Sequence, residues 1–334
     1  MLNGHGDDIY NYRDKIVSNF SSNICNSQDL QGLQEYLCSR IVQIHSYPEP
    51  DAHSLALLLA KKHSMDAGNI CVTNGATEAI YLLAQAFAGS ETAIIVPTFS
   101  EYEDACKIHN HTVSFYQHLE EVKFPTSVVW ICNPNNPNGY VYDIDYLEKI
   151  VTLHKDTLFI FDQSYGYFTN KPVWDIKKAA DHKNVILLHS MTKEFAIPGL
   201  RLGYFTAHKD ILHRIERYRM PWSVNTLAIE AGKFLLKGTN HIFDIKSYLD
   251  ETKNLQQALK QIERLSVFPT DTHFFLCKLN DGKASELKVW LIDNYGILIR
   301  DAANFRGLDE YYFRIATQSA SENELLVKAI KEWI

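Results

Sequence analysis

The sequence lacks the features that mark several classes of protein. No apolar run approaches the roughly 20 residues that a membrane-spanning helix needs. The first residues, MLNGHGDDIYNYRD, are too polar to form the core of a signal peptide. The six cysteines form no CxxC pair and have no metal-ligand spacing, so neither a disulfide framework nor a metal site is predicted. We therefore expect a cytoplasmic protein with reduced thiols and no contact with membranes.

Positive charge is also scarce. The 33 Lys and Arg residues are outnumbered by 40 Asp and Glu residues, which gives a net charge of -7. This balance argues against a surface built to bind nucleic acid, although a small anionic ligand needs only local positive charge. There is no internal repeat and no Gly/Ser linker, so any domain boundary must fall within ordered structure. With 334 residues, 46% of them hydrophobic, the chain can bury one large core and a smaller one.

The middle of the chain alternates short apolar runs with helical segments. The runs cover residues 92–98, 127–133, 157–163 and 184–189, and the clearest helical segment covers residues 142–155. Continuously apolar strands that alternate with helices predict a mostly parallel sheet with helices on both faces. Ligands bind such sheets at the carboxyl ends of the strands, so the polar residues that close these runs are candidate site residues.

The flanking regions have other patterns. Residues 51–64 predict a helix with Asp51 as its N-cap and with Leu55, Leu58 and Leu59 on one face. Residues 210–236 predict helical structure broken at Pro221, a candidate hinge. Strands are predicted over 273–279, 295–301 and 311–317, followed by a helix, which is typical of a small α+β domain. The predicted divisions are an N-terminal segment over 1–45, packed near the active site and the small domain, a large domain over 46–220, and an interdomain helix with the small domain over 221–334.

The most informative segment is HSMTKEFAIPGLRLGY, which follows the last of the apolar runs. Lys193 comes just after this predicted strand, and Arg201 follows it closely. A lysine amine can form an imine with an aldehyde cofactor, while Ser190 and Arg201 can bind the phosphate of that cofactor. An exposed lysine and a structural arginine are the alternative interpretation.

Three other strand ends fit the same kind of cofactor. Asp162 could pair with a protonated pyridine nitrogen, and Tyr165 could donate to a ring oxygen. In the segment NGAT, Gly75, Ala76 and Thr77 open a helix whose free N–H groups could bind phosphate. Asn136 lies in the rigid turn NPNNPNG after another strand. Taken singly, Asp162 could instead be a helix N-cap, and the other two segments could be ordinary turns.

Together these motifs resemble the fold-type I pyridoxal 5'-phosphate (PLP) enzymes of aminotransferase class I and II. The resemblance runs from about Ser46 to Thr317 and is most specific between Lys193 and Tyr204. It implies a large α/β domain with a mostly parallel central sheet between helices, a smaller α+β C-terminal domain, PLP as cofactor, and a homodimer with shared active sites. One departure is Asn138, which replaces the usual Thr of NPNNPTG.

The resemblance also implies roles for individual residues. Lys193 would be the Schiff-base lysine and the general acid and base. The other cofactor contacts would be Asp162 on the pyridine nitrogen, Tyr165 and Asn136 on the ring oxygen, Tyr102 stacked on the ring, Gly75, Ala76, Thr77, Ser190 and Arg201 around the phosphate, and Tyr47 reaching the phosphate of the neighbouring subunit.

The two ends of the chain bear on the substrate. Arg314 matches the arginine that binds the substrate carboxylate in this family, and a planar guanidinium suits a carboxylate because it can bind both oxygens. Arg300 matches a second arginine that relatives with phosphorylated substrates use, and Asn136 also lies on the substrate side. For Arg306 we expect surface ion pairs with Asp301, Asp309 or Glu310 instead.

The segments GHGDDIY and FSSNICN are similar to HGGN and FSANINP of the L-threonine O-3-phosphate decarboxylases of cobalamin biosynthesis. This similarity implies that His5, Gly6 and Asn23 help Arg300 to bind a substrate phosphate. The match departs at Asp7 and Asp8, which replace Gly and Asn, and in lacking the final Pro. Two acidic residues beside a phosphate site argue against this assignment.

We therefore predict a PLP-dependent decarboxylase of a phosphorylated amino acid, most closely L-threonine O-3-phosphate. The first alternative is a histidinol-phosphate-type or other class I/II aminotransferase, because both reactions start from the same cofactor and residue types do not decide which bond breaks. The second alternative is a non-catalytic PLP-binding regulator, which usually carries a DNA-binding domain; the region before Tyr47 is too short for one.

Overall fold

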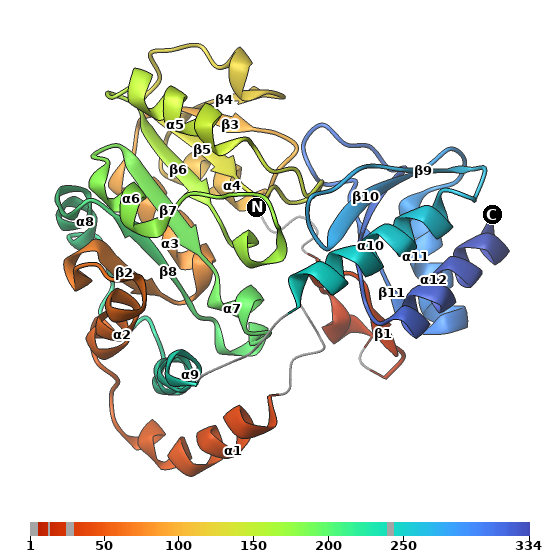
Figure 1. The fold of residues 1–334 in the computed structure, drawn as a ribbon, viewed down its shortest axis with the longest axis horizontal. Coiled ribbons are helices and arrows are strands. Elements are labelled where there is room, and N and C mark those ends of the chain that lie inside the picture. The colour runs from red at the N-terminus through yellow and green to blue at the C-terminus, as the bar shows by residue number, and fades with distance from the viewer. Residues whose placement is uncertain (1–5, 13, 25–29, 239–243) are drawn as a thin grey trace.

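The fold is built on two main sheets, of seven and four strands, and a separate two-stranded pair (Figure 1). A computed structural model describes residues 6–12, 14–24, 30–238 and 244–334 of the chain. In these residues no helix is long and apolar enough to cross a membrane. His5, one of the predicted substrate-binding residues, lies outside the described part of the chain.

The larger sheet has seven strands in the order β2-β8-β7-β6-β5-β3-β4. Only β8 runs opposite to the others, so the prediction of a mostly parallel sheet is confirmed. The strands are β2 (Ile70–Thr73), β3 (Glu91–Ile95), β4 (Thr112–Tyr116), β5 (Val128–Cys132), β6 (Leu158–Asp162), β7 (Val185–His189) and β8 (Gly203–Ala207). The four predicted central strands are therefore present, with ends no more than three residues from those expected.

Side chains of the central strands alternate between two apolar layers because successive residues of a strand point to opposite faces. Trp130, Ile160 and Ile186 belong to one layer, whereas Phe159 and Leu187 belong to the other. The first layer is covered by α3 (Gly75–Ala86), α4 (Glu101–Ile108) and α8 (Lys209–Glu216), and the second by α5 (Ile144–Leu153) and α6 (Ile176–Asp181). Both faces of this sheet are buried, which explains its continuously apolar strands.

The smaller sheet is antiparallel and has the order β12-β13-β10-β9. Its strands are β9 (Leu265–Val267), β10 (Phe274–Leu279), β12 (Arg300–Asp301) and β13 (Tyr312–Ala316), and it packs with α10 (Ile245–Leu259), α11 (Ala284–Tyr295) and α12 (Ala320–Trp333). The prediction of a single strand over residues 295–301 is wrong. This segment forms two short strands because β11 (Ile297–Leu298) pairs with β1 (Ser18–Asn19), whereas β12 pairs with β13.

The remaining helices pack at one edge of the larger sheet. They are α1 (Gln31–Arg40), α2 (His53–His63), α7 (Met191–Glu194) and α9 (Thr226–Lys237). Short 3-10 turns occur in several parts of the chain, at Ile9–Asn11, Ile41–His45, Ala67–Asn69, Leu119–Glu121, Gly166–Phe168 and Pro198–Leu200. The helical break at Pro221 is confirmed, since α8 ends at Glu216 and α9 begins at Thr226. In α2, Leu55 and Leu59 are buried and Leu58 is half-buried.

The N-cap predicted for α2 is displaced by one residue. Ala52 occupies the cap position, and the carboxylate of Asp51 accepts a hydrogen bond from the N–H of His53 at 3.1 Å. Both sheets lie within the predicted large and small divisions, whose boundaries at 45 and 220 stay a prediction.

Candidate active site

A cavity of about 230 Å³ lies where the carboxyl ends of the central strands face the smaller sheet. Most of the predicted site residues line it, although they are scattered along the chain. From the larger sheet and its connections come Ala76, Thr77, Tyr102, Asn136, Asp162, Tyr165, Ser190, Lys193 and Arg201, and from the remainder come Gly6, Asn23, Arg300 and Arg314. The structure therefore brings these residues together, while their individual roles stay predictions.

Lys193 lies on the short helix α7, directly after β7, with Ser190 at the N-cap position. Burial lowers the pKa of its amine to about 8, and the positive charges of Arg314 and Arg201 act in the same direction. A lowered pKa increases the fraction of neutral amine near neutral pH. Because only a neutral amine can attack a carbonyl carbon, this environment suits a nucleophilic lysine.

Asp162 is the last residue of β6 and is buried beneath the cavity. Its Oδ1 accepts a hydrogen bond from the N–H of Ser164 at 2.9 Å, and its Oδ2 accepts one from the hydroxyl of Tyr102 at 2.7 Å. Burial raises the pKa of the carboxyl group, while these hydrogen bonds oppose that shift. The ring of Tyr102 stacks on Trp130, with the centroids 5.0 Å apart.

The start of α3 and Arg201 form a positively charged corner of the cavity. The first turn of a helix has N–H groups without partners in the helix, and Ala76 and Thr77 line the cavity at this point. Gly75 has a φ of +75°, and a Cβ atom there would lie 2.7 Å from Nη2 of Arg201. A side chain at position 75 would therefore displace the guanidinium, which explains why glycine stands here.

Arg314, on β13, is buried and makes two contacts across the cavity. Its Nη1 donates to Oδ1 of Asn136, and its Nη2 donates to the carbonyl oxygen of Ser21 at 2.6 Å. Its Nε has no partner among the described residues, and the same is true of the side-chain atoms of Asn23 and Ser22. These buried polar atoms require partners, so a polar ligand fits this wall of the cavity.

Arg300 lies opposite Arg314 on the neighbouring strand β12. Burial lowers the pKa of each of these two guanidiniums to about 10. Nη2 of Arg300 donates to Oδ1 of Asn304 at 2.6 Å. Gly6 packs closely on this pair, because a Cβ atom there would lie 2.9 Å from Cδ of Arg300 and 3.6 Å from Nη2 of Arg314.

The acidic residues of the N-terminal segment are placed differently from each other. Asp7 lines the cavity, has a φ of 60°, and accepts a hydrogen bond from Asn19 at 2.6 Å. Asp8 forms an ion pair with Lys288, whose Nζ is 2.6 Å from its Oδ2. Only Asp7 lines the cavity, but the charge of Asp8 also acts on Arg300, so both acidic residues remain close to the proposed anion site.

Two predicted contacts have other surroundings. Tyr47 does not line the cavity; its side chain is 85% exposed and its ring lies 5.4 Å from that of Trp222. Arg306 was expected to pair with acidic residues near it in sequence, but it forms a two-pronged ion pair with Glu103 of α4, at 2.8 and 2.5 Å. That partner could not be identified from the local sequence.

Several cavity residues were not among the predicted site residues. Phe305 and Thr192 line the cavity, as do the serines Ser21, Ser22 and Ser164. Ser21 and Ser22 directly precede Asn23, and Thr192 directly precedes Lys193, so their positions beside predicted site residues could have identified them.

Comparisons with known proteins identify the family of the chain. The family model described as aminotransferase class I and II matches residues 16–330. Threonine-phosphate decarboxylase of Salmonella typhimurium is 31% identical over 93% of this chain and 90% of its own length. Histidinol-phosphate aminotransferase of Methanocaldococcus jannaschii is 28% identical over 90% of this chain and 85% of its own length.

A solved structure, that of L-threonine-O-3-phosphate decarboxylase from Porphyromonas gingivalis, superposes with a TM-score of 0.93. It is 41% identical and covers 95% of this chain and 99% of its own. The fold is thus that of the type I PLP-dependent transferases, as predicted. The chain belongs to the aminotransferase class I and II family and is an enzyme of that class.

Proposed function

We propose that the protein is a PLP-dependent decarboxylase of L-threonine O-3-phosphate. One observation carries the proposal: two buried guanidiniums, those of Arg300 and Arg314, lie side by side on neighbouring strands of the cavity wall. A substrate that has both a carboxylate and a phosphate needs two such groups, because planar guanidiniums bind these anions through paired hydrogen bonds. The relatives named as threonine-phosphate decarboxylases support the same substrate.

The cavity fits the cofactor as well. Arg201 and the start of α3, with Ala76, Thr77 and Ser190, would bind the cofactor phosphate, since helix N-termini and guanidiniums both favour anions. Asp162 would hold the pyridine nitrogen in its protonated form, and Tyr165 and Asn136 would face the ring oxygen. PLP, when bound, supplies an electron sink for the electrons of the bond that breaks. Tyr102 would lie beside the ring and orient Asp162 through its hydroxyl.

The substrate-binding residues divide between the two anionic groups. Arg314 would bind the carboxylate, which keeps the leaving CO₂ on the side of the smaller sheet. Arg300, with Gly6 and Asn23, would bind the phosphate, and His5 would join them. Lys193 would bind the cofactor covalently and then return a proton to Cα after CO₂ departs, leaving a phosphorylated amino alcohol. Its lowered pKa suits this exchange of protons near neutral pH.

The test is product analysis with PLP-loaded protein. Given L-threonine O-3-phosphate, the protein should release one CO₂ per amino alcohol phosphate formed and no keto acid. Formation of glutamate from 2-oxoglutarate in the presence of histidinol phosphate, without CO₂ from threonine phosphate, would reject the proposal.

A histidinol-phosphate aminotransferase is the second candidate. It is favoured by the relative from Methanocaldococcus jannaschii and by the solved histidinol-phosphate aminotransferase from Clostridium acetobutylicum, which is 27% identical with a TM-score of 0.85. In that reaction Lys193 would move the proton from Cα to the cofactor instead of returning it to Cα. The same paired assay distinguishes the two reactions.

A homodimer with shared active sites is part of the proposal. Large apolar side chains are exposed on the 3-10 turn Ile41–His45 and nearby: Ile44, Tyr47, Met220 and Trp222 are between 48% and 85% exposed. Clustered apolar exposure of this kind favours an interface, and Tyr47 would reach the neighbouring site from it. We also propose a cytoplasmic location, because the five described cysteines are free.

A further inference from the structure

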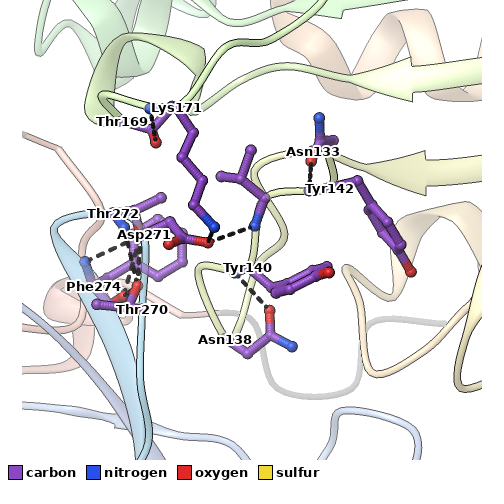
Figure 2. Close-up of polar contacts among 11 residues, drawn as sticks. Asn133, Asn138, Tyr140, Tyr142, Thr169, Lys171, Thr270, Asp271, Thr272 and Phe274 are labelled. Carbon is purple, nitrogen blue, oxygen red and sulfur yellow. Dashed lines mark hydrogen bonds and ion pairs between the residues drawn. The ribbon is translucent and has the colours of Figure 1, made fainter. Parts of the chain in front are cut away.

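A short turn beside the smaller sheet contacts a loop that follows a strand of the larger sheet. The turn comprises Thr270, Asp271 and Thr272 and leads into β10, and the loop comprises residues 135–141 after β5. Figure 2 shows the two segments facing each other, with Asp271 between them. This contact lies outside the cavity, since neither Asp271 nor its partners line it.

Asp271 makes three polar contacts with the larger sheet's connections. Its Oδ2 accepts hydrogen bonds from the N–H of Val141 at 3.0 Å and from Nζ of Lys171 at 2.9 Å. Its own N–H donates to the carbonyl oxygen of Gly139 at 3.1 Å. Because Lys171 is 52% exposed, its ion pair with Asp271 is screened by solvent, and we expect the two backbone contacts to matter more.

The packing around Gly139 is tight. Gly139 has a φ of +71°, and a Cβ atom there would lie 1.9 Å from Oγ1 of Thr270 and 2.6 Å from Oγ1 of Thr272. The two threonine hydroxyls are themselves directed to the carbonyl oxygen of Phe274. The turn therefore has a fixed shape, and the loop can approach it only because residue 139 lacks a side chain.

The loop is closed on itself as well as held by the turn. The N–H of Gly139 donates to the carbonyl of Asn135 at 2.7 Å, and the N–H of Tyr140 donates to Oδ1 of Asn138 at 3.1 Å. Asn138, which replaces the family's usual Thr, thus supplies an acceptor within the turn. A closed loop transmits a displacement of residues 139–141 to residue 136.

Asn136 is where this loop reaches the cavity. Its Oδ1 accepts a hydrogen bond from Arg314, which lies on β13 opposite Leu276 of β10. The same loop therefore meets the same small sheet twice: at Asp271, before β10, and at Arg314, beside the middle of β10. Asn135 also binds the carbonyl of Pro97 and the hydroxyl of Thr98, which follow β3 of the larger sheet, so the two contacts with the smaller sheet set the orientation of the loop relative to Arg314.

We propose that Asp271 is a positioning residue that fixes the 135–141 loop on the smaller sheet, so that Asn136 faces Arg314 and the cofactor ring. The inference rests on the role proposed above for Asn136. Without the carboxylate, the N–H of Val141 loses its acceptor and the loop gains freedom to rotate, which moves the Asn136 side chain. Asp271 touches neither cofactor nor substrate and acts through Asn136.

Two measurements test this without any substrate. In hydrogen exchange on the PLP-loaded protein, the segment that contains Val141 should exchange at least about tenfold faster in Asp271→Ala, since one hydrogen bond has been removed. In pH titrations of the visible absorbance of bound PLP, the midpoint should rise by about one pH unit in Asp271→Ala and in Asn136→Ala, because a donor to the ring oxygen stabilises its charged form.

Matched variants separate the contacts. Asp271→Asn keeps an acceptor for Val141 and should stay within about twofold of wild type in the exchange rate. Lys171→Ala removes the ion pair and the contact of this amine with the ring of Tyr140, 5.9 Å away. Because Lys171 is largely exposed, both contacts are screened by solvent and the variant should stay within about twofold of wild type in the exchange rate. The variant with both Asp271→Ala and Asn136→Ala should have the midpoint of Asn136→Ala alone, because the two residues act in series.

The inference is overturned if Asp271→Ala leaves the exchange of residues 139–141 unchanged, or if it lowers only the melting temperature. Additive midpoint shifts in the double variant would also overturn it. Since neither measurement uses an amino acid, a failed decarboxylation assay would leave these outcomes intact, and a failure here would leave the decarboxylation assay intact.

Discussion

The hydroxyl of Tyr102 donates a 2.7 Å hydrogen bond to Oδ2 of Asp162, deep under the cavity. The bond lowers the pKa of a carboxyl group whose burial raises it, so it favours the carboxylate form that a pyridinium partner needs. The hydroxyl of Tyr102 therefore has a role in the site in addition to the stacking proposed for its ring.

Replacing this hydroxyl tests its contribution. Tyr102→Phe keeps the ring and removes the bond, so PLP affinity should fall by on the order of tenfold, the size of one hydrogen bond to a charged group. Fluorescence titration with PLP measures this change. Tyr81→Phe is a matched control, because the hydroxyl of Tyr81 binds Glu101 at the same distance outside the cavity. Equal losses in the two variants would contradict the assignment.

Lys193 is predicted to be the covalent attachment point of the cofactor. In the wild-type protein, borohydride reduction should attach PLP permanently to the chain. Lys193→Ala should lack both this attachment and the visible absorbance of bound PLP. It should also reduce turnover by about a thousandfold or more, because the group that transfers the proton is gone. Lys209→Ala, at the exposed start of α8, should change neither. Mass spectrometry of the reduced wild-type protein should find PLP on Lys193; PLP on another lysine would refute the prediction.

The lowered pKa of the Lys193 amine predicts how the stability of the cofactor-free protein changes with pH. Burial lowers the pKa of Lys193 from 10.5 to about 8. Below pH 8 the amine is charged in both the folded and the unfolded state, so the folded state bears the cost of a buried charge. Between pH 8 and 10.5 the folded state releases the proton first, and stability should rise with pH.

This pH dependence can be measured by thermal unfolding with Lys193→Met as the reference. The variant should melt a few degrees above the cofactor-free wild type at pH 7, and the gap should narrow as the pH rises through 8 towards 10. A gap that is constant with pH would show that the charge of Lys193 is not its source.

Arg300 and Arg314 are predicted to bind different parts of the substrate. Arg300→Ala should raise KM for threonine phosphate on the order of a hundredfold and leave binding of unphosphorylated threonine nearly unchanged, since only the phosphate loses its partner. Arg314→Ala should weaken both ligands alike. Changes in cofactor absorbance on titration give the dissociation constants of threonine phosphate and of threonine for each variant. The ratio of these two constants shows whether the variant has lost phosphate binding alone. The same ratio in both variants would count against separate roles.

The exposed apolar residues near Tyr47 predict the oligomeric state. Wild type should sediment as a dimer, and a variant with Val42→Asp and Ile44→Asp, two residues that are 66% and 57% exposed, should sediment as a monomer because the charges would be buried at the interface. If Tyr47 completes the site of the neighbour, the monomer should bind PLP about tenfold more weakly than the dimer. A monomeric wild type that binds PLP fully would refute the shared site.

Much of the site could be predicted because of one geometric rule. Asp162 ends one strand and Lys193 comes just after another. Because the ends of parallel strands meet at one edge of a sheet, their sequence positions were sufficient to predict that they lie together. The contacts of Asp7 with Asn19 and of Asp271 with Val141 follow no such rule. They depend on how separate segments cross in space and on backbone groups that every residue has.

The strand predicted over residues 295–301 shows a related limit. Its apolar pattern indicated extended structure correctly, but which neighbour each half would pair with is not encoded in the segment itself. Ile297 and Leu298 pair with β1 and Arg300 with β13, so one pattern produced two strands.

The pairing of β1 with β11 carries a last consequence. It joins the N-terminal segment to the part of the chain that holds Arg300 and Arg314, as the red and blue ribbons in Figure 1 show. Apart from Asn136, the described residues proposed to bind the substrate are therefore grouped on one side of the cavity, while Lys193, Asp162 and Arg201 occupy the other. In evolutionary terms, such a layout permits mutations that change the preferred substrate to accumulate on one wall while the cofactor chemistry is inherited unaltered on the opposite wall.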